Sequence, residues 1–458
     1  MAAIEVKYDP VLKLEPIVDV MYATKNEDNP QEKLYGGNQQ VDQTKITGIA
    51  APLIAYDGNV IQWSEIKSFY LSCETLLPRV SIIANDSNGI FKGLTRPSKD
   101  NILRVQILPP FEDAYKKIDL PFYVTQFSYN GSTMMIDGIY HVPELRNCRL
   151  EAFGEITTYE MVDKVAKACQ LGLASNISNS QDKRWIYCQN ESYRDLIKKE
   201  IVWSGSEQQI LDCWVDWHNY LNFVDLYDRY NSKEEGLKVW TTPTCNIDVD
   251  TDATIEPAQV DAIITNHPSV RQSQLYINDY TPLSNTSKSV REGTDKIIEV
   301  YNISNCESSS ILIQDGDAHN DIFTKTIYGG ENFGEFNYLL QKSCRDAYIQ
   351  KMNDTMMVVA LAQPVLGFER GGKVDLRWFD SNDLLNDAKA NNPIDTNTPT
   401  DDEIEPESFV INKQVSGQYY IYKTELRFEG IKAQSTGWKY KLWLCRPQEE
   451  INAYKKEQ

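Results

Sequence analysis

The chain lacks the features that mark membrane proteins, secreted proteins and many enzymes. It has no run of the roughly 18 apolar residues that a membrane-spanning helix needs, and its start, MAAIEVKYDP, has no signal-peptide pattern. It contains no GxxxxGKS/T, GxGxxG or GxSxG motif, the glycine-rich turns of phosphate-binding loops, dinucleotide folds and serine hydrolases. These absences favour a non-enzymatic protein that is made and kept in a cytosol.

Histidine is scarce, and no cysteines have metal-ligand spacing. The nine cysteines stand singly, without a CxxC pair, which predicts reduced and mostly buried thiols instead of disulfides or a zinc site. The four histidines are far apart, and each is expected on the surface or as a satisfied core residue: His141, His218, His267 and His319. We therefore expect no catalytic set and no cofactor.

Basic residues are too few for a phosphate-binding surface to dominate. Acidic residues outnumber basic ones 66 to 46, a net charge of −20, so the chain as a whole should repel nucleic acid. A pair of carboxylates in so acidic a chain is no sign of a glycosidase. With 458 residues, of which 41% are hydrophobic, the chain is expected to form about two to four domains.

One local pattern is a weak candidate for a metal site. In DGDAHND (315–321), Asp315, Asp317 and Asp321 are spaced somewhat like calcium ligands. A helix–loop–helix calcium loop has Gly at its sixth position and Glu at its twelfth, where this chain has Asn320 and Thr326. A solvated turn is therefore the favoured interpretation.

Three tryptophans could form a surface that stacks on sugars. Trp203, Trp214 and Trp217 lie on or beside a predicted amphipathic helix. In that position packing is the more common role, and we expect these side chains in the core.

The chain does contain a run of three β-strands that is written twice. Apolar and polar residues alternate with period 2, as half-buried antiparallel strands require. The first run comprises 101–108, 119–131 and 134–146, and the second comprises 372–379, 416–430 and 438–447. A duplicated β-unit doubles a symmetry element, which indicates assembly more than catalysis.

The alternation predicts which face of each unit is buried. The edges of such sheets are covered either by closure of the sheet or by a partner sheet. A charge placed at Leu376 or Leu426 should unfold the second unit, because an unpaired buried charge costs several kcal/mol. The residues expected to form the core of the two units are Leu103, Val105, Ile107, Tyr123, Phe127, Val374, Leu376, Trp378, Tyr420, Tyr422, Leu426 and Phe428.

Helical patterns separate the two copies. Capped helices are predicted at 157–172, after Ser192, and from Ser206 through Val215, and a strand is predicted at 220–230. A further helix is expected at 336–352. The copies therefore flank an α/β insert.

An acidic stretch at 382–408 interrupts the second copy, and its composition predicts a mobile loop. Its carboxylates either are solvated or dock on a basic patch of a neighbouring subunit: Asp401, Asp402, Glu403, Glu405 and Glu407. Unchanged assembly after deletion of 386–406 would favour the first interpretation.

Three groups of residues carry a resemblance to a known family. They are Phe153-Gly154 with the helix at 157–172 and LGLASN, Trp217 leading into LNFVD (221–225), and a Gly-Gly strand start followed by VSGQYYI (415–421) and YKLWLCR (440–446). Over about residues 60–447 the chain resembles the baseplate hub proteins of contractile-tailed bacteriophages, and the related hub part of type VI secretion spike proteins. The arm at 24–45 and the loop at 382–408 are longer than the pattern needs.

The resemblance implies a β-rich α+β fold with two tail-tube-like antiparallel β-barrel domains that flank an α/β insert. The expected divisions are an N-terminal arm with first strands (1–59), a first barrel (60–154), an α/β middle region (155–350) and a second barrel (351–458).

It also implies a homotrimer whose six barrels match a sixfold tail tube to a threefold spike. DNA would pass through the lumen without specific binding, past an acidic wall. Expected partners are a separate spike protein, the tail tube, baseplate wedge proteins and the tape measure, in a virion baseplate assembled in the host cytoplasm.

Three other functions remain open. A tail-tip hub of a non-contractile tail uses similar barrels, and a neighbouring sheath gene would separate the two. A peptidoglycan-degrading or carbohydrate-binding β protein would act on cell walls as a monomer, and a receptor-binding module would bind intact cells.

Overall fold

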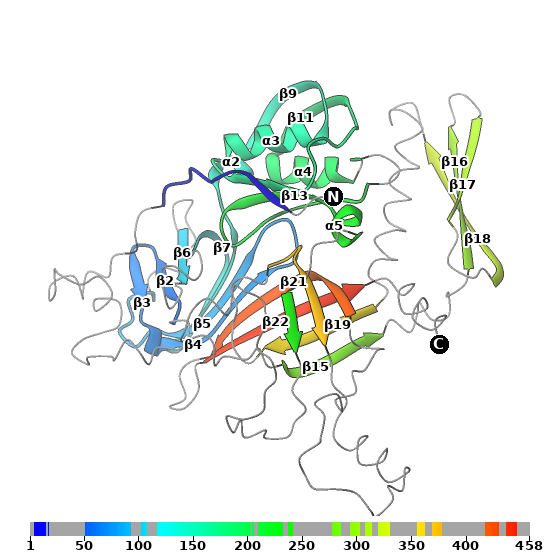
Figure 1. Ribbon diagram of the computed structural model, residues 1–458. Helices are drawn as coiled ribbons and strands as arrows, with labels where there is room; N and C mark the ends of the chain where they lie inside the picture. Colours follow the sequence, from blue (N-terminus) through cyan, green and yellow to red (C-terminus); the bar gives the residue numbers. More distant parts are fainter. Residues whose placement is uncertain are drawn as a thin grey trace, which may run out of the picture.

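The computed structural model describes residues 4–14, 17, 51–92, 102–107, 117–202, 204–205, 209–231, 237–240, 277–284, 294–302, 307–313, 319–329, 355–361, 369–377, 417–429 and 437–446. Within them the chain forms one wide, curled sheet, an α/β layer above it and a separate three-stranded sheet (Figure 1). The protein is therefore β-rich, with few helices, as the sequence predicts.

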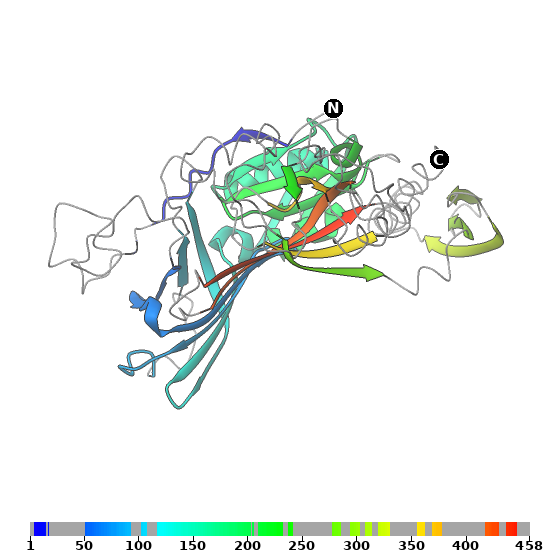
Figure 2. The same ribbon diagram turned by 60° about the horizontal axis from the view of Figure 1, so that its bottom comes forward.

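Thirteen strands make up the wide sheet, which curls into a half-barrel (Figure 2). From the first half of the chain come β2 (Leu53–Tyr56), β3 (Asn59–Ile61), β4 (Ile66–Cys73), β5 (Arg79–Asn85), β6 (Ile102–Ile107), β7 (Ile118–Asn130) and β8 (Thr133–Tyr140), with the short 3-10 helix η2 (Trp63–Glu65) before β4. From the second half come β14 (Leu237–Trp240), β15 (Ile277–Ser284), β19 (Thr355–Leu361), β20 (Lys373–Arg377), β21 (Gly417–Glu429) and β22 (Trp438–Arg446).

The two predicted strand triplets are confirmed as β6, β7, β8 and β20, β21, β22. In β22 the apolar side chains alternate with lysines as predicted, and Trp438, Tyr440 and Leu442 are buried. The local pattern of side chains was therefore enough to place these strands.

The repeat extends beyond the triplets to five strands. In chain order the first set is β4 to β8, and the second is β15, β19, β20, β21 and β22. In the sheet both sets run in the order third, fourth, fifth, second and first strand, with every neighbouring pair antiparallel. The fourth strand, β7 or β21, has 13 residues in each set. The duplication is thus a property of the backbone topology as well as of the sequence.

The two sets are joined edge to edge in the wide sheet. β21 pairs antiparallel with β4, which places Leu426 opposite Leu71 and Phe428 opposite Phe69. All four side chains are buried in one hydrophobic core that continues from the first set into the second and into the insert. We call the β4–β21 junction the seam.

The α/β insert lies above the wide sheet (Figure 1). Its four-stranded sheet has the order β1, β10, β13, β12, and a two-stranded ribbon pairs β9 with β11. Its elements are β1 (Glu5–Tyr8), α2 (Pro143–Arg146), β9 (Cys148–Ile156), α3 (Thr158–Ala168), β10 (Gly172–Ser175), β11 (Arg184–Ser192), α4 (Tyr193–Ile201), β12 (Leu211–Val215), β13 (Tyr220–Asp225) and α5 (Leu226–Asn231). The capping box of α3, from Thr157 and Glu160, and the Ser192 cap of α4 are both present, as predicted.

The third predicted helix, from Ser206 through Val215, is wrong. Residues 211–215 form β12, which pairs with every residue of β13 from Leu221 to Asp225. A short apolar run fits a helix and a buried strand equally well, and here the turn at 216–219, with Asn219 at a φ of +65°, folds the chain back into a hairpin. The strand predicted at 220–230 ends at Asp225, and α5 begins at the next residue, Leu226. The helix predicted at 336–352 lies outside the described residues.

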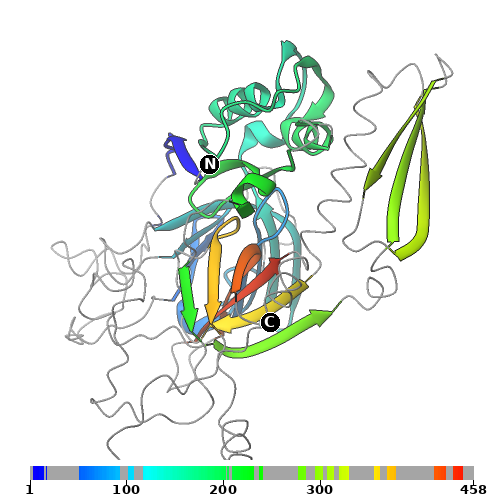
Figure 3. The ribbon, with the colours of Figure 1, turned by 45° about the vertical axis from the view of Figure 1, so that its right-hand side comes forward.

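A separate three-stranded sheet lies between β15 and β19 in the chain. It has the order β17, β16, β18 and consists of β16 (Thr294–Asn302), β17 (Glu307–Ile313) and β18 (His319–Gly329). Figure 3 shows it standing apart from the wide sheet. The sequence of this region is difficult to assign because an independent sheet interrupts the second β set.

None of the helices in the described part of the chain has the length and apolarity to cross a membrane. The six described cysteines are free thiols, of which only Cys148 is exposed.

Candidate functional site

The insert is fastened to the second β set by a buried arginine. Arg370, just before β20, donates from Nη1 to the carbonyl of Thr75 at 2.9 Å and from Nη2 to Oδ2 of Asp212 at 2.7 Å. Its guanidinium also lies 4.8 Å from the centre of the Trp214 ring. Burial lowers the pKa of Arg370, but the Asp212 carboxylate together with Cys73, Tyr420 and Tyr422 raises it overall, so the side chain stays charged.

A partly buried group of two acids and one histidine lies beside this arginine. Nε2 of His218 is 2.7 Å from Oε1 of Glu369. Asp216 accepts hydrogen bonds from the backbone N–H groups of His218 and Tyr220 at 2.8 and 3.0 Å, and from Nδ2 of Asn222 at 3.0 Å. These contacts bring the β12–β13 turn against the residue that precedes Arg370.

The titration of this group follows from its burial. Burial and the neighbouring Glu369 raise the pKa of Asp216 to about 6. Burial would lower the pKa of His218, but its contacts with Glu369 and Asp216 raise it overall. Asp216 can therefore take up a proton near pH 6 although its side chain is buried.

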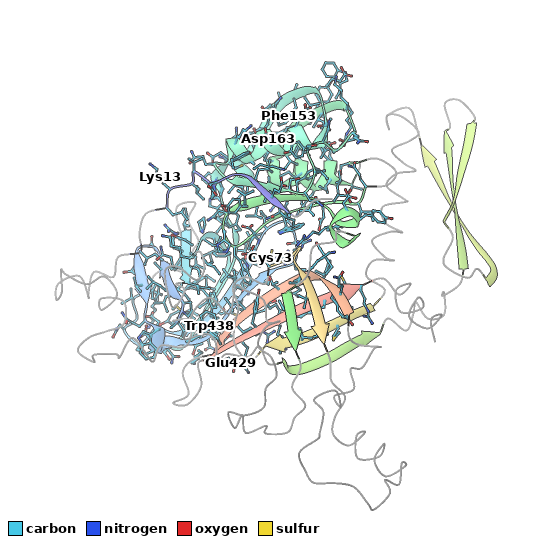
Figure 4. The ribbon with its side chains drawn as sticks, viewed as in Figure 1. Lys13, Cys73, Phe153, Asp163, Glu429 and Trp438 are labelled. Carbon is cyan, nitrogen blue, oxygen red and sulfur yellow. The ribbon has the colours of Figure 1, made fainter. Side chains whose placement is uncertain are left out.

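We use the name joint for Asp212 of β12, the β12–β13 turn and the segment Glu369–Gly372, which contact one another. The thiol of Cys73, at the end of β4, donates to the carbonyl of Val215 at 3.6 Å, and Figure 4 shows Cys73 at this meeting point of insert and sheet. Arg229 of α5 donates to the carbonyl of Gly371 at 2.9 Å. The joint therefore has a structural role, because its polar groups contact one another and the backbone.

A second polar cluster lies on the open face of the seam. Glu425 is only 4% exposed, and its carboxylate accepts from the Tyr70 hydroxyl at 2.5 Å and lies 3.1 Å from Nζ of Lys423 and 3.3 Å from Nη2 of Arg427. Burial and Glu425 raise the pKa of Tyr70 to about 12, so the phenol remains protonated. Tyr70 belongs to the first set and the other three residues to the second, so this cluster ties the two sets together.

The β9–β11 ribbon exposes an apolar patch. Leu150, Trp185 and Tyr187 are 87%, 63% and 44% exposed, and the two rings stack with centroids 6.2 Å apart. Exposed tryptophan and tyrosine are typical of protein contact surfaces. The tryptophan candidates chosen from the sequence did not include Trp185. The alternation of Trp185 and Tyr187 with the buried Ile186 could have indicated it.

The predicted core residues occupy both sets. Tyr123 is half-buried, with the guanidinium of Arg146 3.4 Å from its ring centre, while its neighbours Phe122 and Val124 are fully buried. Leu103, Val105, Ile107, Val374, Leu376, Tyr420, Leu426 and Phe428 are buried, Phe127 and Tyr422 are half-buried, and Trp378 lies outside the described residues.

The weak metal candidate is not assembled in the described part of the chain. Asp315 and Asp317 lie outside it, and Asp321 is on β18, where only the backbone is described. Among the described residues, no three histidine, cysteine, aspartate or glutamate side chains are grouped as metal ligands.

The packing interpretation of the tryptophans is confirmed for two of them. Trp214 and Trp217 are among the largest fully buried side chains. Trp203 and the acidic run at 401–407 lie outside the described residues.

No protein-family model and no curated protein matches this chain. Solved structures do match its fold. A tail protein from Neisseria meningitidis MC58 has a TM-score of 0.51 at 8% identity, over 87% of this chain and 97% of its own. The 43 kDa tail protein of prophage MuSo2 from Shewanella oneidensis also has a TM-score of 0.51, at 11% identity, over 87% of this chain and 98% of its own.

A weaker match, with a TM-score of 0.44 at 10% identity, is to a chain of the Francisella PdpA–VgrG complex, over 87% of this chain and 58% of that one. At such low identities the likeness concerns the fold alone. The chain has the fold of phage tail proteins, in agreement with the resemblance drawn from its sequence.

Proposed function

We propose that the protein is a structural baseplate hub of a phage tail. Three copies form a pseudo-sixfold ring that adapts the tail tube to the central spike and lets DNA pass through its lumen. The observation that carries the proposal is the pair of equivalent five-strand sets, joined at the seam within one chain. A threefold ring of such chains presents six similar units, which is the symmetry match that an adaptor between sixfold and threefold structures requires.

Each set contributes one tube-like barrel in this proposal. The first barrel corresponds to 60–154, and the second comprises β15 together with 351–458, because β15 is the first strand of the second set. The predicted core residues pack the inside of the two units, and the joint sets the position of the insert relative to both.

The partners follow from this role. The ring would contact the tail tube on one side and a separate spike protein on the other, with wedge proteins and the tape measure as further neighbours. The exposed patch of Leu150, Trp185 and Tyr187 is suited to a protein neighbour at the periphery. No step of this role requires catalysis, and DNA is a passing cargo without a specific binding site.

The decisive experiment measures mass and activity on the full chain, alone and with the product of the adjacent spike gene. Multi-angle light scattering should give three times the 52.5 kDa of one copy for the chain alone, or that mass plus the mass of the bound spike for the mixed sample. A protein that is monomeric in both samples and clears a peptidoglycan suspension would overturn the proposal in favour of a cell-wall enzyme. If the protein is a trimer, a sheath gene next to its own gene would indicate the hub of a contractile tail, and the absence of one would indicate the tail-tip hub of a non-contractile tail.

A further inference from the structure

The two β sets are equivalent residue by residue, which lets one be overlaid on the other. Tyr123 of β7 and Tyr420 of β21 each lie opposite the first residue of the preceding strand, Ile102 or Lys373. Two residues further on, both strands have a register shift against the last strand of their set, at Thr125 and at 422. In this overlay each residue of β7 corresponds to the residue of β21 whose number is 297 higher, as Tyr123 corresponds to Tyr420.

The first strands of the two sets align in the same way. β4 shifts register against β5 at Lys67, between Ile66 and Ser68, and β15 shifts against β19 at Asn278, between Ile277 and Asp279. Matching these irregularities places Ser72 of β4 over Leu283 of β15. The strands between them connect the two alignments without a shift. Across the sheet Ser72 leads through Arg79 and Ile139 to Tyr123, and Leu283 leads through Met356 and Cys445 to Tyr420, so both irregularities give one overlay of the whole set.

The sets differ at one edge. The outer part of β21, residues 424–429, is covered by β4 of the other set, and its side chains are mostly buried. The equivalent part of β7, residues 127–130, has no strand along that edge among the described residues, and Ser128 and Asn130 are exposed there. At the other end of the sheet β15, the equivalent of β4, pairs only with β19 among the described strands. Figure 2 shows the β7–β8 hairpin extending freely from the sheet.

We propose that β15 of one copy pairs antiparallel with residues 127–130 of β7 in the next copy, which repeats the seam between chains. The inference rests on the proposed ring and identifies its subunit interface. The overlay sets the register between β15 and β7 of the next copy: Ser284 lies opposite Phe127, Leu283 opposite Ser128, Pro282 opposite Tyr129, and Thr281 opposite Asn130.

The backbone can make most of the hydrogen bonds of this pairing. Asn130 pairs with Thr133 across a two-residue turn, so its backbone groups point toward β8 and those of Tyr129 and Phe127 point to the free edge. Pro282 has no N–H and removes one bond from the ladder. Proline on a strand at the sheet edge also discourages indiscriminate pairing, so the edge is short and selective.

The pairing closes the assembly. Within one chain the seam joins the first set to the second, and between chains the same contact joins the second set to the next first set. A ring of six sets uses every such edge, whereas an open chain of subunits would leave one β7 and one β15 unpaired. The same contact therefore serves within and between subunits.

A disulfide placed across the proposed interface tests it. Ser128 and Leu283 would face each other at a non-hydrogen-bonded position, where Cα atoms lie about 4.5 Å apart, within the roughly 4.4–6.8 Å span of disulfides. In one chain these residues are on strands separated by most of the sheet. The full chain with Ser128→Cys and Leu283→Cys, oxidised with or without the spike product, should therefore give covalently linked species on a non-reducing gel that end at three copies.

Three controls are matched to this variant. Glu429→Cys with Ser68→Cys is a directly opposed pair at the seam, four residues along β21 from the position equivalent to Ser128, and should link within one chain. Ser128→Cys with Thr281→Cys is out of register by two residues and should link far less. Each single variant reports the background from the native thiols, of which Cys148 is exposed.

The outcomes separate the interface from the proposed function. A trimer by light scattering that fails to link, while the seam control links, overturns the pairing and leaves the hub role standing. Linked species that grow past three copies support the pairing and overturn the closed ring. A protein that neither forms trimers nor links overturns both.

Discussion

Shortening the leucines at the seam should show that the two β sets unfold as one body. Leu71 of β4 and Leu426 of β21 lie directly opposite each other, and both are 0% exposed. Leu→Ala at either position removes buried surface and leaves a cavity, so each change should lower the free energy of unfolding by about 2–5 kcal/mol. Because the two side chains share a contact, the double variant should lose less than the sum of the two, by about 0.5–3 kcal/mol.

Urea unfolding of the four proteins, followed by tryptophan fluorescence and by far-UV circular dichroism, measures these values. The two signals should give coincident transitions, because the core is continuous across the seam. The control combines Leu71→Ala with Ile186→Ala, a buried residue of β11 on the ribbon, and should be additive within about 0.5 kcal/mol. Additive losses at the seam pair, together with two separate transitions, would refute the idea of a shared core.

Two further predictions concern the joint. Gly371→Ala should lower the melting temperature, because its φ of +86° costs an L-residue about 1–2 kcal/mol and its Cβ would lie 2.7 Å from Cζ2 of Trp214. The control Gly154→Ala, at a φ of +83° with open space around it, should show the backbone cost alone, and equal losses would rule out the clash. The free energy of unfolding should rise as pH falls from about 8 to 5. In the folded protein the pKa of Asp216 is raised to about 6 and that of His218 is also raised, so the folded state binds protons more readily than the unfolded state. The stabilisation is lost as pH rises through those values, and thermal melts in which Asp216→Asn leaves this pH slope unchanged would contradict the assignment to Asp216.

The elements that the sequence predicts well are those specified by neighbouring residues. Thr157 and Glu160 satisfy each other's backbone groups within one turn, so the start of α3 can be predicted without knowing the fold. The alternation in β21 and β22 similarly reports which side of each strand is buried. These signals are local, and the tertiary structure leaves them intact.

The elements that the sequence misses depend on distant partners. β12 was predicted as a helix because its five residues suit either state, and only pairing with β13 makes them a strand. β15 was not predicted as part of the second copy, because β16, β17 and β18 separate it from β19 in the chain. The joint was missed as well, since Arg370 and Asp212 are 158 positions apart.

By itself the sequence determined that one β-unit occurs twice around a capped α/β insert, because strand alternation and helix caps are written in adjacent residues. The tertiary structure decided that the repeat has five strands and that its copies share one sheet. Tyr70 donates a hydrogen bond to Glu425 between them, although the two residues are 355 positions apart in the sequence. The physical reason is that strand pairing uses backbone N–H and C=O groups that nearly every residue has. Side-chain pattern can therefore predict a strand and its buried face, whereas the choice of which edge meets which is made only when the chain folds.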